Sequence, residues 1–291
     1  MHSLTRRAVA ALLTVPVLAA CGRRDAAGGD EMSRVVCVSK QINEFVYDIG
    51  AQDHLLARDL TSVWPPEIVS KPNVGYHRAL SADGIISMRP SLLLTDGNVG
   101  PDAVLEQVKK VGIPVETMAP GGSLDSAMML LTRLGDRFGV RAKADTVVAA
   151  WKAGMDSLYA DTAKLAGTGK RPRVLFIHFG QINNNYLALK SGGPADQMLR
   201  WAGGVNAIDS VGGMARVTPE LIAKAQPDVI IATEVGFDRY GSAEKFLEVP
   251  GVALTPAGKS KKIYRITEQK IMYYGPRTPA VVREIAQLIH Q

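Results

Sequence analysis

The sequence predicts an α/β protein made of two similar lobes that are joined by one long helix, with a ligand cleft between the lobes. Three observations lead to this prediction: a segment of the first half recurs in the second half, each copy has an apolar strand upstream, and a long amphipathic stripe separates the halves. An α/β lobe is favoured because short helices precede strands that are apolar on both faces.

The first 20 residues are typical of a signal peptide, with two arginines followed by an apolar stretch over 8–20. This stretch is too short for a transmembrane helix, which needs about 20 apolar residues. It ends in "LAAC", the pattern at which bacterial lipoproteins are cut and acylated on the cysteine, here Cys21. Cleavage beside small residues without lipidation is the alternative. We therefore predict an exported protein, in the periplasm or at the cell surface, anchored to a membrane through a lipidated flexible tether over 21–33.

Composition limits the classes of partner. The net charge of +6 falls to +4 when the two arginines of residues 1–20 are removed, and the basic residues form no long run. We therefore predict no nucleic-acid binding. The second cysteine, Cys37, lies in an apolar run and is predicted to be a core thiol, so that the exported protein folds without a disulfide. We expect a monomer.

The internal repeat defines the two lobes. Residues 81–97 align without gaps on 218–234, so that Asp83 falls on Glu220 and one apolar triplet falls on another. In each copy a short helix ends near a proline and a buried strand follows. Opening strands are predicted upstream of the two copies, at 34–39 and 173–178. We place the lobes at 34–139 and 170–291.

The connecting helix is predicted over 140–169. Its apolar side chains recur at steps of three, four and seven, which describe one amphipathic stripe, formed by Val140, Ala144, Val147, Val148, Trp151, Met155, Leu158 and Leu165. A continuous helix of this length spans roughly 39 Å, enough to run along both lobes. A stiff connector of this kind predicts a cleft that opens and closes only slightly.

The most specific segment is "NVGYHRALSADG", residues 73–84, which sets Tyr76, His77 and Arg78 side by side after a glycine. With the lipoprotein N-terminus, the repeated lobes and the connecting helix, the chain resembles the substrate-binding lipoproteins of bacterial ABC importers, of the helical-backbone type that carries ferric siderophores, cobalamin or haem. It resembles the haem-binding members most, through residues 74–95. The remaining similar segments are 42–62, 192–208, 217–233 and 274–289, and together they cover most of the mature chain.

The resemblance implies roles for individual residues. Tyr76 corresponds to the axial ligand of haem iron and Arg78 to the residue that supports its phenolate, while His77 stands where many relatives have methionine. An acid on each lobe, here Asp83 and Glu220, meets arginines of the permease, so the implied partner is a permease dimer with its ATPase. Both acids also fit favourable charges at the first turn of helices capped by serine or threonine.

The chemistry of the residues is consistent with these roles. Ferric iron is a hard cation, tyrosine is an established haem ligand, and Arg78 supplies a positive charge beside it. Tyr76 alone also fits an ordinary loop aromatic. His77 would point away from Tyr76 in an extended chain. His178 ends a strand, where it is a candidate distal ligand, a contact of a second stacked haem, or a plain strand-end residue.

Haem carries two propionates, so its cleft needs cationic groups at the rim and apolar walls within. Arg78, Lys190 and Arg216 lie in segments that are expected to reach the cleft, and Tyr240 is a candidate to pack on a porphyrin face. Each of these residues also fits a solvated surface position.

Other functions have weaker support. The sequence contains no nucleophile elbow, phosphate-binding loop or paired-histidine zinc motif, so we predict that the protein is not an enzyme, and a haem-modifying enzyme is the disfavoured alternative. Its five histidines are scattered, whereas bare-metal binding needs three or four clustered ligands. A ferric siderophore or cobalamin carrier of the same fold remains the alternative.

Overall fold

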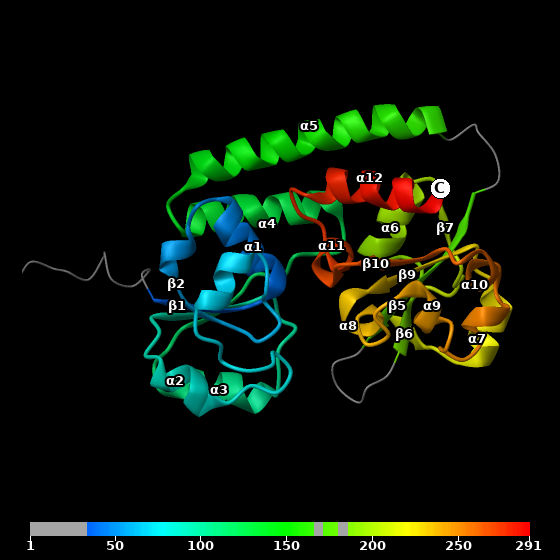
Figure 1. Cartoon of the computed structure of the whole chain (residues 1–291). Coiled ribbons are helices and arrows are strands. Elements are labelled where there is room, and N and C mark those ends of the chain that lie inside the picture. Colours follow the sequence, from blue (N-terminus) through cyan, green and yellow to red (C-terminus); the bar gives the residue numbers. More distant parts are fainter. Residues whose placement is uncertain (1–33, 166–170, 180–185) are drawn as a thin grey trace, which may run out of the picture.

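The computed structural model describes residues 34–165, 171–179 and 186–291. Two α/β lobes lie side by side, and helix α5 (Arg141–Leu165) runs along one side of both (Figure 1). The predicted fold class of two lobes joined by one long helix is therefore confirmed. The predicted signal peptide, Cys21 and the tether lie outside the described residues, and the exact lobe boundaries stay predictions.

The first lobe is built on a four-stranded sheet in the order β2-β1-β3-β4, in which every pairing is parallel. Its two central strands are buried along their whole length, as expected where helices cover both faces of a sheet. The strands are β1 (Val35–Val38), β2 (Leu55–Arg58), β3 (Leu92–Thr95) and β4 (Val115–Thr117). The helices are α1 (Lys40–Asp48), α2 (Ala82–Ser87), α3 (Asp102–Lys110) and α4 (Leu124–Arg137), with short 3-10 turns at Gln52–His54 and Pro66–Ser70.

The second lobe differs in its sheet, which has six strands in the order β10-β9-β5-β6-β8 with β7 paired to β5. Strand β6 is antiparallel to β5 and to β8, whereas the pairs of β5, β9, β10 and β7 are parallel. The strands are β5 (Arg173–Phe179), β6 (Tyr186–Leu189), β7 (Val205–Asn206), β8 (Met214–Arg216), β9 (Val229–Thr233) and β10 (Ile263–Ile266). The helices are α6 (Pro194–Trp201), α7 (Pro219–Ala225), α8 (Glu234–Phe237), α9 (Ala243–Phe246), α10 (Pro256–Ser260), α11 (Glu268–Met272) and α12 (Thr278–Ile289), with a 3-10 turn at Val252–Leu254.

The repeat read from the sequence is present as matched elements, α2 followed by β3 and α7 followed by β9. Ser81 and Thr218 cap the two helices, and their side chains accept hydrogen bonds from the backbone N–H of Gly84 and Leu221. Asp83 and Glu220 occupy the second helical position of each copy. The predicted caps are therefore confirmed, and the two acids lie at equivalent places on the two lobes.

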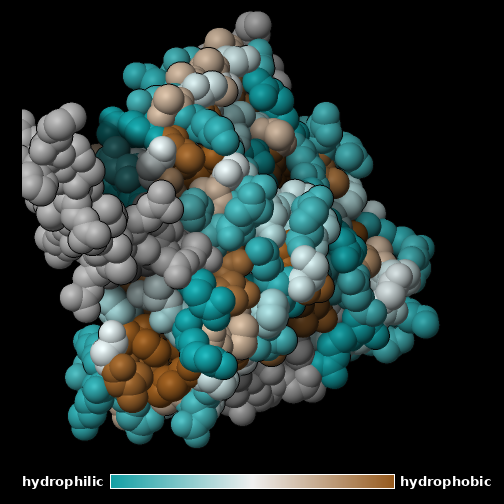
Figure 2. Space-filling model, turned by 90° about the vertical axis from the view of Figure 1, so that its left-hand side faces the viewer, coloured by the Kyte–Doolittle hydropathy of each residue, from teal (hydrophilic) through white to brown (hydrophobic). Residues whose placement is uncertain are grey.

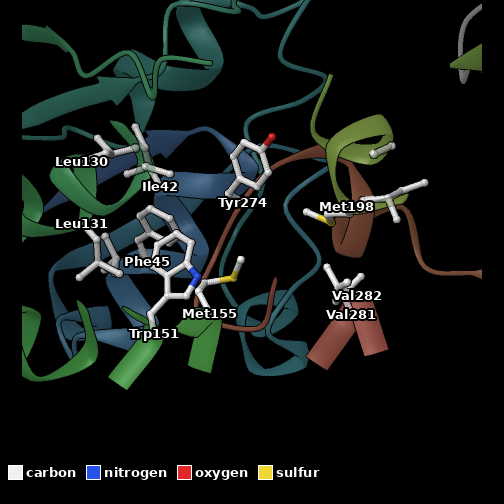
Figure 3. Packing of buried hydrophobic residues seen from close by; sticks show 14 of the residues in the cluster. Ile42, Phe45, Leu130, Leu131, Trp151, Met155, Met198, Tyr274, Val281 and Val282 are labelled. Atoms are coloured by element: carbon white, nitrogen blue, oxygen red, sulfur yellow. The ribbon is translucent and has the colours of Figure 1, made fainter. Parts of the chain in front are cut away.

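One hydrophobic cluster extends through both lobes on the side that α5 covers. Trp151, Met155 and Leu158 of α5 are buried in it together with Phe45 of the first lobe and Val282 of the second (Figure 3). The rings of Phe45 and Trp151 meet edge to face at 6.0 Å, a favourable arrangement for an aromatic pair. The apolar stripe predicted from Val140 to Leu158 is thus the side that packs on both lobes, while the side chain of Leu165 and residues 166–169 of the predicted helix lie outside what the structure describes.

The predicted core thiol is confirmed, because Cys37 is buried and has no disulfide partner among the described residues. Burial raises the pKa of this thiol well above its usual value, so it stays protonated and inert. No helix in the described part of the chain is long and apolar enough to cross a membrane.

The surface at the first-lobe end is mostly hydrophilic, and hydrophobic side chains gather in a patch near its lower edge (Figure 2). The exposed large hydrophobic residues of this lobe include Leu60, Val63, Trp64 and Val69, which belong to one segment.

Candidate functional site

A cavity of about 640 Å³ lies between the two lobes. Its volume falls within the usual range for small-molecule sites, about 300–1,000 Å³. Polar and charged groups share its wall with apolar ones. The first lobe contributes Val38, Ser39, Lys40, Gln41, Asp59, Thr61, Tyr76, His77, Arg78, Asp96, Asn98, Pro120, Gly121, Gly122 and Ala127, and the second contributes His178, Leu187, Pro194, Met214, Glu268, Met272, Tyr273 and Tyr274.

The loop that carries Tyr76 is a tight turn. Gly75 has φ of 102°, in the left-handed region that favours glycine, and the N–H of Ala79 donates to the carbonyl of Tyr76 at 2.8 Å. The N–H of Gly100 donates to the carbonyl of His77 at 2.8 Å and ties the turn to the neighbouring segment. The backbone therefore fixes the turn and directs it at the cavity.

The sequence expectation that His77 points away from Tyr76 is wrong. The two rings lie 4.5 Å apart between centroids, and both residues line the cavity. The expectation assumed an extended chain, in which neighbouring side chains alternate, whereas the turn brings both side chains to one side.

The side chains of Asp59 and Thr61 lie beside the Nδ1 atom of His77. The His77 Nδ1 atom lies 3.3 Å from the Thr61 hydroxyl and 3.9 Å from the Asp59 carboxylate. Asp59 is buried, and it accepts hydrogen bonds from the Thr61 N–H at 2.9 Å and from the hydroxyls of Thr61 and Ser62. Burial lowers the pKa of His77, and nearby Asp59 opposes that shift. The imidazole is thus oriented by its Nδ1 side.

Arg78 lies at the exposed edge of the cavity. Its guanidinium donates a 2.8 Å hydrogen bond to the Asn98 side-chain oxygen. Asn98 in turn belongs to a segment stabilised by Asp96, which accepts hydrogen bonds from the Asn98 N–H at 2.8 Å and the Ser39 hydroxyl at 2.7 Å. The predicted residues Tyr76, His77 and Arg78 are therefore brought together on one wall.

His178 faces them from the second lobe. It lies in β5, is 8% exposed, and its Nδ1 atom is 3.5 Å from the Thr233 hydroxyl. Burial lowers the pKa of His178, and neighbouring Lys40 lowers it further while Glu268 opposes both. The imidazole is therefore a neutral group at neutral pH.

The other sequence-predicted residues lie farther from the cavity. Arg216 pairs in register with Leu187, which lines the cavity, so its exposed side chain lies on the same face of the sheet beside the mouth. Lys190 and Tyr240 are absent from the cavity wall. The ring of Tyr240 packs in a cluster within the second lobe, 5.4 Å from the ring of Phe246.

The sequence reading missed the groups that join the lobes at the base of the cavity. Lys40 and Glu268 form an ion pair at 2.5 Å across the cleft. Deeper, Tyr273 donates to Glu44 at 2.8 Å, and the Arg277 guanidinium is paired with the same buried carboxylate. One signal was available for Glu44: a carboxylate that lies next to the apolar pair Phe45 and Val46 requires a partner if the segment is buried.

The described residues contain no group of three or more histidine, cysteine, aspartate or glutamate side chains that could hold a bare metal ion. The polar residues that converge on the cavity include three tyrosines, two histidines, two cations and three carboxylates, and they share the wall with apolar side chains. Such a wall can hold a flat apolar ligand that carries negative charge and a hard metal centre.

Comparisons with known proteins agree with this architecture. The sequence profile of the family described as "Periplasmic binding protein" matches residues 35–270. The solved structure of the periplasmic heme-binding protein RhuT from Roseiflexus sp. RS-1 is 27% identical, with a TM-score of 0.80, and the match covers 89% of this chain and 98% of that one.

Two curated proteins are also similar. The uncharacterized ABC transporter substrate-binding lipoprotein YvrC of Bacillus subtilis is 25% identical over 264 residues, which cover 89% of this chain and 81% of YvrC. The vitamin B12-binding protein of Pectobacterium atrosepticum is 23% identical over 202 residues, which cover 68% of this chain and 70% of that protein.

Proposed function

This chain belongs to the periplasmic binding protein family, and from that premise we propose that it binds haem outside the cytoplasmic membrane and delivers it to an ABC importer. The observation that carries the proposal is the glycine-led turn that presents Tyr76 to the cavity between the lobes, beside His77 and Arg78. Similarity to a heme-binding protein over nearly the whole chain supports it.

In this proposal Tyr76 is the axial ligand of ferric haem. Its phenolate is a hard ligand for a hard ion, and Arg78, two residues on, supplies positive charge near the iron. His178 on the facing wall contacts the other side of the porphyrin. Apolar side chains such as Val38, Leu187 and Met272 give the porphyrin a dry surface on which to lie.

Delivery requires a partner, and the similarity to an ABC transporter substrate-binding lipoprotein supports a permease dimer with its ATPase. Asp83 and Glu220 occupy equivalent exposed helix starts on the two lobes. Two matched acids are the arrangement expected of a surface that meets a transporter built from two similar subunits. A lipid on Cys21 would hold the protein at the membrane, as a monomer tethered near its transporter.

The protein acts here as a carrier that binds and releases its ligand unchanged. A cobalamin carrier is the second candidate, because the vitamin B12-binding protein of Pectobacterium atrosepticum is similar over most of its length. A ferric siderophore would bind to arginines and aromatic rings without a protein ligand to iron.

The proposal is tested by titrating the purified mature chain with ferric haem. Separate titrations use cobalamin and a ferric siderophore. With haem, we expect the absorbance in the Soret region to change until the chain is saturated. Mass spectrometry of the intact complex then shows whether one or two haems are bound per chain. Tight cobalamin or siderophore binding without haem binding would overturn the proposal.

A further inference from the structure

Lys40 and Glu268 form a contact that joins the lobes inside the cavity. The ammonium of Lys40 and the Glu268 carboxylate are 2.5 Å apart, and both residues line the cavity wall. Their side chains keep 20% and 7% exposure, so the lysine is the more accessible partner. The ammonium of Lys40 therefore keeps part of its attraction to water, whereas the Glu268 carboxylate is buried.

The two backbones that hold this pair are firmly placed. Lys40 is the first residue of α1, directly after the cap Ser39, whose hydroxyl donates to Asp96. Glu268 is the first residue of α11, and its N–H donates to the Glu234 carboxylate at 2.6 Å. The flexible four-carbon stem of the lysine is therefore the part of this contact that can move.

The other charged residues on the cavity wall have partners within their own lobe. Arg78 donates to Asn98, Asp59 accepts from Thr61 and Ser62, and Asp96 accepts from Ser39 and Asn98. Among the cavity-lining residues that the structure describes, Lys40 is the cation whose carboxylate partner comes from the opposite lobe. A carboxylate on a ligand that enters the cleft would compete directly with Glu268 for it.

We propose that Lys40 is a ligand-carboxylate-binding residue of the cleft and that Glu268 holds it in place until a ligand carboxylate displaces Glu268. The inference rests on the proposed function, since it takes a haem propionate as the displacing group. It has a consequence that a merely structural ion pair lacks. Removal of the two partners changes ligand affinity in opposite directions, because Lys40 attracts the propionate whereas Glu268 competes with it.

The test compares ferric haem with its dimethyl ester, in which both propionates are esterified and uncharged. Lys40→Met removes the cation and keeps the length of the side chain, and Glu268→Gln removes the competing charge and keeps the shape. The matched control is the pair Lys109 and Glu106, which lies exposed on α3 away from the cavity, changed to Lys109→Met and Glu106→Gln.

We expect Lys40→Met to weaken haem binding about tenfold, the scale of one charge-assisted hydrogen bond, and to leave binding of the diester unchanged. Glu268→Gln is expected to tighten haem binding about threefold, again without effect on the diester. The double variant should bind haem like Lys40→Met, because the competition between Glu268 and the ligand carboxylate requires Lys40. The two control variants should match the wild type.

Three results would overturn the inference: equal losses with haem and the diester, weaker haem binding in both single variants, or a gain from Glu268→Gln that persists without Lys40. The first two would mean that the pair is a structural tie between the lobes. If Lys40→Met fails to fold, Glu268→Gln still tests the inference, because tighter haem binding supports it and weaker haem binding contradicts it. Absence of haem binding in the wild type would instead refute the proposed function itself.

Discussion

Tyr273 of the second lobe donates a 2.8 Å hydrogen bond to the carboxylate of Glu44 in the first lobe, directly beneath the cavity. The same carboxylate is paired with Arg277, whose guanidinium also lies 5.0 Å from the centre of the Tyr273 ring. Burial raises the pKa of the Tyr273 hydroxyl well above its usual value, so it remains a donor throughout the physiological range. Three side chains thus join the lobes around the buried carboxylate of Glu44.

Glu44→Gln is expected to lower the free energy of unfolding by about 3 kcal/mol, because it leaves the Arg277 charge buried without its counter-ion. Urea denaturation at neutral pH measures the change. Glu116→Gln is the matched control, since Glu116 pairs with Arg137 at a half-exposed site within one lobe. It should lose less than about 1 kcal/mol. Equal effects of the two variants would contradict the importance of the buried pair.

Tyr76→Phe is expected to abolish the charge-transfer absorption of a high-spin, phenolate-ligated ferric haem and to weaken haem binding. The substitution keeps the ring and removes only the oxygen, so the apolar wall still retains some haem. Absorption spectra during haem titration provide the measurement.

His77→Ala serves as the control for ligand identity and should keep the phenolate spectrum. Arg78→Ala should also keep it near neutral pH but lose it more readily on acidification, because the phenolate lacks its neighbouring positive charge. If the tyrosine variant keeps the native spectrum and the histidine variant loses it, the ligand is His77.

Charge reversal at both Asp83 and Glu220, to lysine, is expected to abolish haem uptake by cells while haem binding in solution stays normal. The two acids lie at equivalent helix starts, so repulsion would act on both halves of the transporter surface. Uptake assays and haem titration of the same variant separate the two properties. Normal uptake by the double variant would exclude a docking role.

The contribution of His178 to stability should decrease as the pH falls through about 6.5, the ordinary pKa of an unfolded histidine. Burial lowers the pKa of His178, so over this range the unfolded chain binds a proton that the folded chain does not. Glu268, Lys40 and Thr233 are its neighbours in the fold, and His77 shifts in the same direction. His178→Asn should make unfolding free energies at about pH 7.5 and about pH 5.5 more nearly equal. An unchanged difference would contradict this assignment.

The N-terminal residue of the mature protein is predicted to be an acylated Cys21. Mass spectrometry of the N-terminal peptide from membranes of expressing cells should detect the lipid. Cys21→Ala should release the protein from the membrane fraction without changing haem binding. An unmodified N-terminus that begins elsewhere would refute the prediction.

Local patterns predicted most of the fold. The apolar strands, the helix caps Ser81 and Thr218 and the stripe along α5 depend on residues close in sequence, where periodicity and capping chemistry act directly. The antiparallel strands β6 and β8 of the second lobe were not predicted, because the internal repeat contains no equivalent of them. In addition, the sequence of one strand does not reveal which strand it pairs with.

The sequence predicted three consecutive residues on one wall of the site and His178 on the facing wall, but not the charged groups that join the two lobes. Tyr76, His77 and Arg78 are consecutive, so a motif reveals them together. Lys40 and Glu268 are far apart in the chain and meet only when both lobes are assembled, and either alone has the appearance of a solvated surface charge. The direction of His77 was missed because it depends on the turn rather than on residue types.

The hydrophobic cluster shared by the two lobes makes their junction a stiff elastic joint. The shared cluster and α5 form this joint. The first residues of α2 and α7 lie at the far ends of the two lobes, away from α5 (Figure 1). A small displacement at these far ends acts through a long lever on a close-packed joint of low compressibility. A force applied at the two helix starts would therefore open the cleft only slightly, and the close-packed joint would favour the return of the lobes.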